Sequence, residues 1–114
     1  MEIRLIKIPI RRSEVEAMAK ATFGEMVKAV VDVKRGIMTI QMELHADGEM
    51  LLLENGSVQT DLWGINLYPG KSAEEWVEFD SMINVRPREN NRSRSVEDPA
   101  IQSKIRSIVN TLVI

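Results

Sequence analysis

An almost strict alternation of apolar and polar side chains runs through residues 37 to 44, IMTIQMEL. Because successive side chains of a β-strand point to opposite faces of its sheet, this pattern predicts a strand with one core face and one polar face. A strand of this kind favours an antiparallel sheet with one open face. The predicted core face carries Met38, Ile40, Met42 and Leu44, and the predicted polar face carries Thr39, Gln41, Glu43 and His45.

Four further segments predict the other strands of this sheet. The valine-rich residues 27–33 precede Lys34-Arg35-Gly36, which predicts a hairpin loop with glycine at positive φ. Residues 3–10, 62–68 and 76–86 contain the β-branched and aromatic side chains typical of strands. In the last segment the predicted inward side chains are Val77, Phe79, Ser81, Ile83 and Val85, and the predicted outward ones are Glu78, Asp80, Met82, Asn84 and Arg86.

Capping residues predict three helices. The first runs from an N-cap at Ser13 to a stop at Gly24. The last opens at Asp98-Pro99 and carries a single apolar stripe. Residues 47–54 suit a short helix with Asp47 as its N-cap, although the following Asn-Gly pair also fits a hairpin turn, and we predict the helix.

These elements define an α+β fold. We expect a single mostly antiparallel sheet of about five strands, with two main helices packed on one face and a polar opposite face. The length of 114 residues suits one domain that spans residues 1–114. Polar side chains on the open face are the natural place for a functional site.

Composition and charge exclude several classes of function. Without cysteine the chain has no disulfide, no thiolate metal site and no cysteine nucleophile. The formal net charge of −2 argues against nucleic acid as a partner. No segment reaches the roughly 18 consecutive apolar residues of a membrane span, and MEIRLIKIPIRR lacks the apolar stretch of a signal peptide. We therefore expect a cytoplasmic protein with no membrane partner, no cofactor and no metal site.

The charges are unevenly distributed along the chain. Five acids and no lysine or arginine lie between residues 41 and 70, whereas residues 84–94 hold four arginines and one glutamate. This distribution predicts a locally dipolar surface. Clusters of this kind are more often solvated surfaces than binding sites.

The pattern Glu43-x-His45-x-Asp47 is the first candidate for chemistry. If the strand continued through Asp47, the three side chains would leave one face about 7 Å apart, a spacing suited to metal ligands or acid–base catalysis. Because a lone histidine is more often a hydrogen-bonded structural residue, we favour a structural role for His45. The alternative is a small hydrolase-like enzyme in which His45 acts with Asp80, Asp47 or Glu43.

The second candidate is an anion site on the outward face of residues 76–86 and the loop that follows. Asp80 would hold the guanidinium of Arg86 in place to bind a phosphate or carboxylate. Alternatively, the two side chains form only a salt bridge with each other and bind no ligand. Asn66 and Tyr68 share one parity in the neighbouring strand and are expected on the same polar side. The predicted ligand-binding residues are Arg86, Arg88, Arg92, Asn84, Asn91, Asp80, Asn66 and Tyr68.

Three segments carry a family resemblance: ELHADGEMLLLENGS, DLWGINLYP and EFDSMINVRPRENNRS. They resemble a small prokaryotic family described as a domain of unknown function, and the resemblance extends over nearly the whole chain. It implies a bacterial or archaeal origin. It brings no catalytic or binding residues.

Two classes of function remain. The leading prediction is a small non-enzymatic or regulatory module that binds an anionic small ligand or a partner protein, and the alternative is the hydrolase-like enzyme. An open sheet face that exposes Met82 and Trp76 favours self-association, so we expect a homo-oligomer, most simply a dimer. The sequence leaves open whether the protein is an enzyme.

Overall fold

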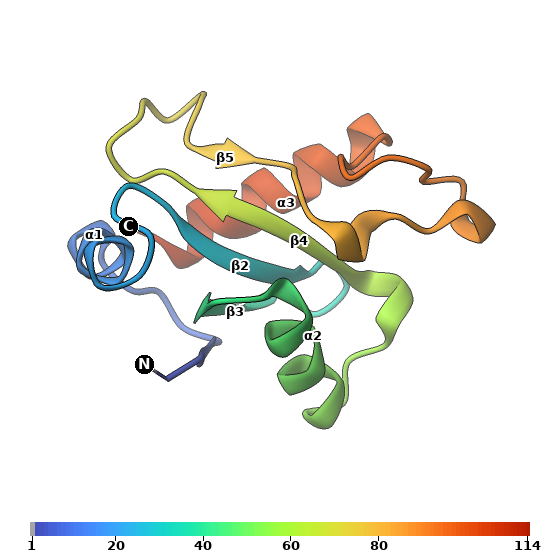
Figure 1. Cartoon of the computed structure of the whole chain (residues 1–114), viewed down its shortest axis with the longest axis horizontal. Coiled ribbons are helices and arrows are strands. Elements are labelled where there is room, and N and C mark those ends of the chain that lie inside the picture. The colour runs from blue at the N-terminus through green and yellow to red at the C-terminus, as the bar shows by residue number, and fades with distance from the viewer. Residues whose placement is uncertain (1) are drawn as a thin grey trace.

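A computed structural model describes residues 2–114 of the protein (Figure 1). Five strands form one open antiparallel sheet in the order β1-β3-β2-β4-β5. They are β1 (Arg4–Ile6), β2 (Val27–Asp32), β3 (Ile37–Met42), β4 (Leu62–Leu67) and β5 (Val77–Glu78). The predicted α+β class with one mostly antiparallel sheet is confirmed.

Three α-helices accompany the sheet: α1 (Arg12–Ala21) joins β1 to β2, α2 (His45–Glu54) lies between β3 and β4, and α3 (Pro99–Leu112) follows β5. The short 3-10 helices are η1 (Gln59–Asp61), η2 (Met82–Asn84) and η3 (Pro87–Glu89). Asp98 caps α3 as predicted, because its Oδ1 accepts the amide of Ala100 at 2.9 Å. The predicted N-caps of the other two helices are wrong, since α1 begins before Ser13 and α2 begins before Asp47. Among residues 2–114, no helix combines the length and apolar composition that crossing a membrane requires.

Apolar side chains pack against both faces of the sheet. On one face, Val15 of α1 and Val109 of α3 join a cluster that includes Val31. On the other face, Leu52 of α2 packs with Val30 of β2. Figure 1 shows α3 behind the sheet and α2 in front of it. The arrangement therefore differs from the predicted one, because α2 covers part of the face that was expected to be polar and open.

A β-bulge at Gln41 ends the alternation of β3. Gln41 has a φ of 75°, and the register between β2 and β3 passes over it from Ile40 to Met42. An extra residue in one strand turns the side chains that follow it to the opposite face. Met42 therefore joins the cluster beneath α2, and Leu44 is 60% exposed. The predicted core face is correct only as far as Ile40.

The strand predicted over residues 76–86 ends at Glu78. Beyond it the chain leaves the sheet, and Ser81 caps η2 by accepting the amide of Ile83 at 3.3 Å. The side chain of Asn84 then pairs with both backbone groups of Gly64, at 2.8 and 2.9 Å. The side-chain amide of Asn84 thus forms the hydrogen bonds that a neighbouring strand would otherwise make with Gly64 of β4. The predicted alternation of inward and outward side chains beyond Glu78 is wrong.

Candidate functional site

Arg86 lies against the start of β4 and is used inside the fold. Its Nη1 and Nη2 donate to the carbonyl oxygens of Gln59 and Leu62 at 2.7 and 2.9 Å. The guanidinium stacks on Trp63, with its carbon 3.9 Å from the ring centre. Its Nε lies 3.2 Å from a carboxylate oxygen of Glu89. With 8% of the residue exposed, Arg86 is a structural cation rather than an open anion site.

Asn91 fixes the arginine loop, residues 86–94, to the rest of the fold. Its Nδ2 donates to the carbonyl oxygens of Asn84 and Ser95, both at 2.7 Å, and its Oδ1 accepts the amide of Glu97 at 2.9 Å. Asn84 and Asn91 are both buried, and their side-chain amides form hydrogen bonds within the fold. They therefore organise the loop and are not directed to a ligand.

Asp80 pairs with Arg94 and not with Arg86. The Nε of Arg94 lies 2.6 Å from Oδ1 of Asp80 at the protein surface. The predicted support of Arg86 by Asp80 is wrong, because the chain leaves the sheet after Glu78 and the two side chains no longer share a strand face. Arg88 and Arg92 are exposed, and anion binding by these two residues stays a prediction.

His45 opens α2 and points into the fold. Its Nε2 lies 2.8 Å from the carbonyl oxygen of Ile65, and 7% of the residue is exposed. Glu43 and Asp47 are exposed and do not converge on it, because the strand ends at Met42 and a helix follows. In the described part of the chain, no group of three or more His, Asp or Glu side chains could hold a metal ion, and no carboxylate is hydrogen-bonded to His45.

A row of polar side chains crosses the sheet beside His45. Lys28, Asn66 and Glu78 are direct neighbours in the register of β2, β4 and β5. Asn66 is 5% exposed, and its Nδ2 donates to Oε1 of Glu78 at 2.8 Å and to the carbonyl oxygen of Asp80 at 3.3 Å. Its Oδ1 is buried and has no partner among residues 2–114. An unpaired buried acceptor costs about 1–3 kcal/mol, and the neighbouring imidazole of His45, whose pKa Asn66 raises, is a donor inside the fold that can satisfy it.

Tyr68 connects the polar row to a pocket. Its hydroxyl donates to Oε1 of Glu78 at 3.2 Å. Burial and the charges of Glu78, Asp80 and Glu25 all raise the pKa of Tyr68. The Nζ of Lys71 lies 4.4 Å from the centre of the Tyr68 ring. Tyr68 therefore lies near carboxylates, and its ring face is already in contact with the ammonium group of Lys71.

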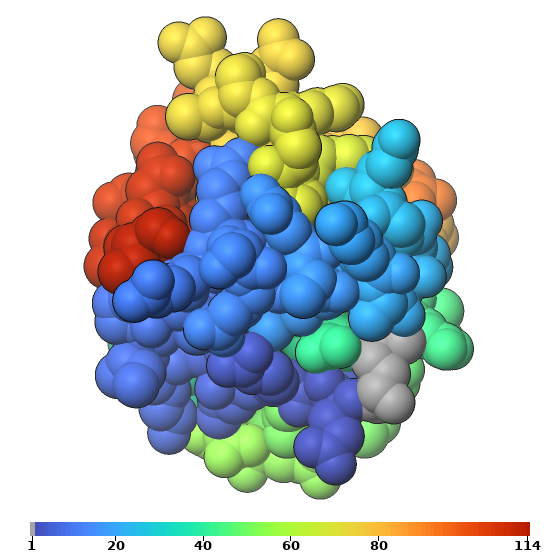
Figure 2. Space-filling view, turned by 90° about the vertical axis from the view of Figure 1, so that its left-hand side faces the viewer, coloured from blue at the N-terminus to red at the C-terminus, as the bar shows by residue number. Residues whose placement is uncertain are grey.

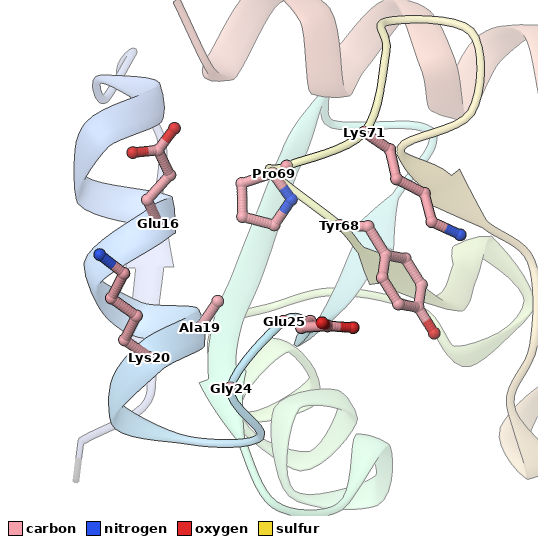
Figure 3. A pocket seen from close by; sticks show the side chains of 9 residues that line it. Glu16, Ala19, Lys20, Gly24, Glu25, Tyr68, Pro69 and Lys71 are labelled. Carbon is pink, nitrogen blue, oxygen red and sulfur yellow. The ribbon is translucent and has the colours of Figure 1, made fainter.

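The pocket beside Tyr68 has a volume of about 470 Å³ and lies between α1 and the turn that follows β4 (Figure 3). Figure 2 shows this side of the molecule, with the connection after β4, in yellow, above α1, in blue. In Figure 3 the carboxylate of Glu25 lies beside the tyrosine side chain. We call this site the tyrosine pocket; the polar and aromatic groups in its lining are Glu16, Lys20, Glu25, Tyr68 and Lys71.

Sequence reasoning found only part of this site. Asn66 and Tyr68 were predicted on one polar side, and both bind the same oxygen of Glu78. Lys28 was missed, although a lysine within the apolar segment VKAVV is a signal for a polar position on a strand. Glu25 carries no local signal, because the pairing of β2 with β4, in which Val27 lies opposite Leu67, brings it near Tyr68.

The buried imidazole makes stability depend on pH. Burial lowers the pKa of His45 from its ordinary value of 6.5, and the bond to the Ile65 carbonyl acts in the opposite direction. The unfolded chain therefore takes up a proton at a higher pH than the folded chain. We expect the free energy of unfolding to be constant above about pH 7 and to fall as the pH drops below about 6.5, by at most about 1.4 kcal/mol per pH unit.

Urea unfolding of the wild type and of His45→Gln between about pH 5 and about pH 8 measures this slope. Glutamine keeps a donor for the Ile65 carbonyl, and His45 is the chain's one histidine, so the variant should lose the slope. Burial raises the pKa of Glu49, which acts in the opposite direction at lower pH. Equal slopes in the two proteins would contradict a buried neutral His45.

The fold and this site define a small α+β protein with an open antiparallel sheet and a pocket at one end of its central strands, lined by two glutamates, two lysines and a tyrosine. The chain belongs to the family described as "Protein of unknown function (DUF5674)", whose model matches residues 4–112. The resemblance to a family of unknown function is thereby confirmed. No curated protein and no solved structure matches the chain.

Proposed function

We propose that this protein is a small non-enzymatic binding module that takes a ligand with a primary ammonium group into the tyrosine pocket. The observation that carries the proposal is the position of two carboxylates beside Tyr68: Oε1 of Glu78 accepts its hydroxyl at 3.2 Å, and Glu25 lies beside the tyrosine side chain in Figure 3. Carboxylates and an aromatic ring face are the groups with which proteins bind ammonium ions. The proposal keeps the cytoplasmic location and the prokaryotic source that the sequence predicted.

We infer a cationic ligand from which polar side chains remain free to bind one. Arg86, Asn84 and Asn91, which were predicted to bind an anion, donate to carbonyl oxygens inside the fold. Beside Tyr68, by contrast, the carboxylate of Glu78 accepts from Asn66 and Tyr68 and forms no salt bridge among residues 2–114. A ligand that brings N–H donors and positive charge can pair with this carboxylate.

Lys71 supports the same ligand class. Its ammonium group lies over the Tyr68 ring at 4.4 Å, although its side chain is exposed. A flexible exposed lysine can turn away into solvent, so a ligand ammonium can take the same ring face. The pocket volume of about 470 Å³ leaves room for a ligand larger than the ammonium group itself.

Titration with ethylammonium chloride, followed through the NMR shifts of the Tyr68 ring and the Asn66 side-chain amide, tests the proposal. We expect saturable shifts at both residues. Glu78→Gln retains the oxygen that accepts from Asn66 and Tyr68 but removes the charge, and should weaken binding by about fivefold, in keeping with the roughly 1 kcal/mol of a charge pair 4 Å apart in water. Glu25→Gln should act in the same direction.

Glu74→Gln removes an equal charge from an exposed residue of the turn that precedes β5 and should leave the affinity unchanged. Sodium acetate at the same ionic strength distinguishes the ligand classes. If acetate shifts these resonances and ethylammonium does not, the ammonium proposal is wrong and an anionic ligand is favoured at this pocket.

A further inference from the structure

The charged side chains that line the tyrosine pocket are of both signs and are not paired with one another. Glu16 and Lys20 belong to α1, Glu25 precedes β2, and Lys71 lies in the turn that follows β4. All four are exposed, and none of the salt bridges within residues 2–114 includes any of them. The pocket therefore offers acceptors for a cation and donors for an anion.

The two kinds of charge are available on different walls of the pocket. Figure 3 shows Lys20 on α1, across the pocket from Tyr68, with Glu25 beside the tyrosine. Glu78, which accepts the tyrosine hydroxyl at 3.2 Å, adds a second carboxylate at that end. Glu16 precedes Lys20 by one helical turn, but an exposed pair at this spacing is weak, so Lys20 can bind a ligand carboxylate.

The floor between the two walls is apolar. The side chains of Ala19 and Pro69 line the pocket, and Figure 3 shows them between Lys20 and Tyr68. Both residues are buried, so they present a fixed surface rather than mobile side chains. A chain of methylene groups is the kind of ligand segment that such a floor accommodates.

Arg12 holds the two walls of the pocket together. It is the first residue of α1, and its Nη2 donates to the carbonyl oxygens of Pro69 and Lys71 at 3.1 and 2.9 Å. Its guanidinium carbon lies 4.2 Å from the ring centre of Trp76, which was predicted to be exposed and is instead buried. The separation of the walls is thus set before a ligand binds, which lowers the entropic cost of binding.

We propose that the ligand of the tyrosine pocket is an amino acid whose ammonium and carboxylate groups lie at opposite ends of the molecule. This inference rests on the proposed function, because the ammonium group takes the place beside Tyr68 described above. The carboxylate binds the ammonium group of Lys20 on α1, and the methylene chain crosses the floor formed by Ala19 and Pro69.

Four probes of the same chain length test the proposal: γ-aminobutyrate, α-aminobutyrate, butylammonium and butyrate. Each is titrated at neutral pH and equal ionic strength and followed through the NMR shifts of the Tyr68 ring. γ-Aminobutyrate should bind about fivefold more tightly than butylammonium, in keeping with one added charge pair in water. α-Aminobutyrate, the isomer with both charges at one end, should gain nothing over butylammonium, and butyrate should bind most weakly.

A matched pair of lysine variants assigns the added affinity to one wall. Lys20→Gln should abolish the advantage of γ-aminobutyrate without lowering the affinity for butylammonium, because only the carboxylate partner is removed. Lys104→Gln removes an equal charge from an exposed residue of α3 that does not line the pocket, and it should leave both affinities unchanged.

The outcomes separate this inference from the proposed function. If butylammonium binds and γ-aminobutyrate binds no more tightly, the inference is wrong and the proposed function stands. If neither ligand shifts the Tyr68 resonances, or butyrate binds more tightly than butylammonium, both are wrong. An advantage that survives Lys20→Gln, or that α-aminobutyrate shares, contradicts a carboxylate bound at the α1 wall.

Discussion

Replacing Asn84 with alanine is expected to lower the free energy of unfolding by about 3 kcal/mol. The Asn84 side chain is fully buried and makes three hydrogen bonds, accepting from the Gly64 amide and donating to the carbonyl oxygens of Gly64 and Arg94. Alanine leaves these backbone groups of β4 and of the arginine loop without partners in a place that solvent does not reach. Chemical denaturation of the purified protein measures the loss.

Asn84→Asp sharpens this test. Aspartate keeps an acceptor for the Gly64 amide but turns a second oxygen toward two carbonyl oxygens, so it should destabilise at least as much as alanine near neutral pH. Asn110→Ala, at an exposed position of α3, is the matched control and should change stability by less than about 0.5 kcal/mol. A loss below about 1 kcal/mol for Asn84→Ala would mean that water replaces the side chain.

Gly64→Ala is expected to cost about 2–3 kcal/mol through overpacking. A methyl group at Gly64 would lie 2.6 Å from both Cβ and Oγ of Ser81 and 3.1 Å from the imidazole of His45. Ser81 cannot withdraw easily, because its amide is bonded to the carbonyl oxygen of Arg94 at 3.0 Å. The substitution should therefore push η2 away from the sheet, and thermal or urea unfolding would record the loss.

A double-mutant cycle separates this clash from other effects. Ser81→Gly removes the atoms that the new methyl group meets, so the double variant should recover at least about 1 kcal/mol relative to the sum of the single changes. At Gly70 a Cβ would meet no atom within 4 Å, and Gly70→Ala should be nearly neutral. Strict additivity of the two substitutions would show that the close approach of η2 to β4 does not limit stability.

Local signals in the sequence predicted a large part of the fold. The Lys34-Arg35-Gly36 hairpin forms as expected, with Gly36 at a φ of 68°. The helix that opens with Asp98 and Pro99 is present, and residues 47–54 are helical. These features depend on residues only a few positions apart, whose turn, capping and propensity preferences act within a single element.

The candidate site was predicted less well, because its contacts join distant parts of the chain. Arg86 was assigned to an anion, but its donors are taken by carbonyl oxygens 24 and 27 positions earlier in the sequence. Asn66 was identified by parity on its strand, whereas its contact with Glu78 depends on the register of β4 and β5. A segment rich in arginine does not reveal whether the guanidinium groups point into solvent or into the fold.

The sequence by itself determined the α+β class, the antiparallel hairpin of β2 and β3, the capping of α3 and the polar parity of Asn66 and Tyr68. These follow from alternation, helical periodicity and turn chemistry, which are properties of short segments. Only the tertiary structure decided that α2 covers the second face, that a bulge at Gln41 turns Met42 to that face, and that Asn84 replaces a strand partner of Gly64. The physical reason is that each buried polar group must find a hydrogen-bond partner somewhere in the packed fold, and the nearest partner is set by the register of distant strands rather than by neighbouring residues.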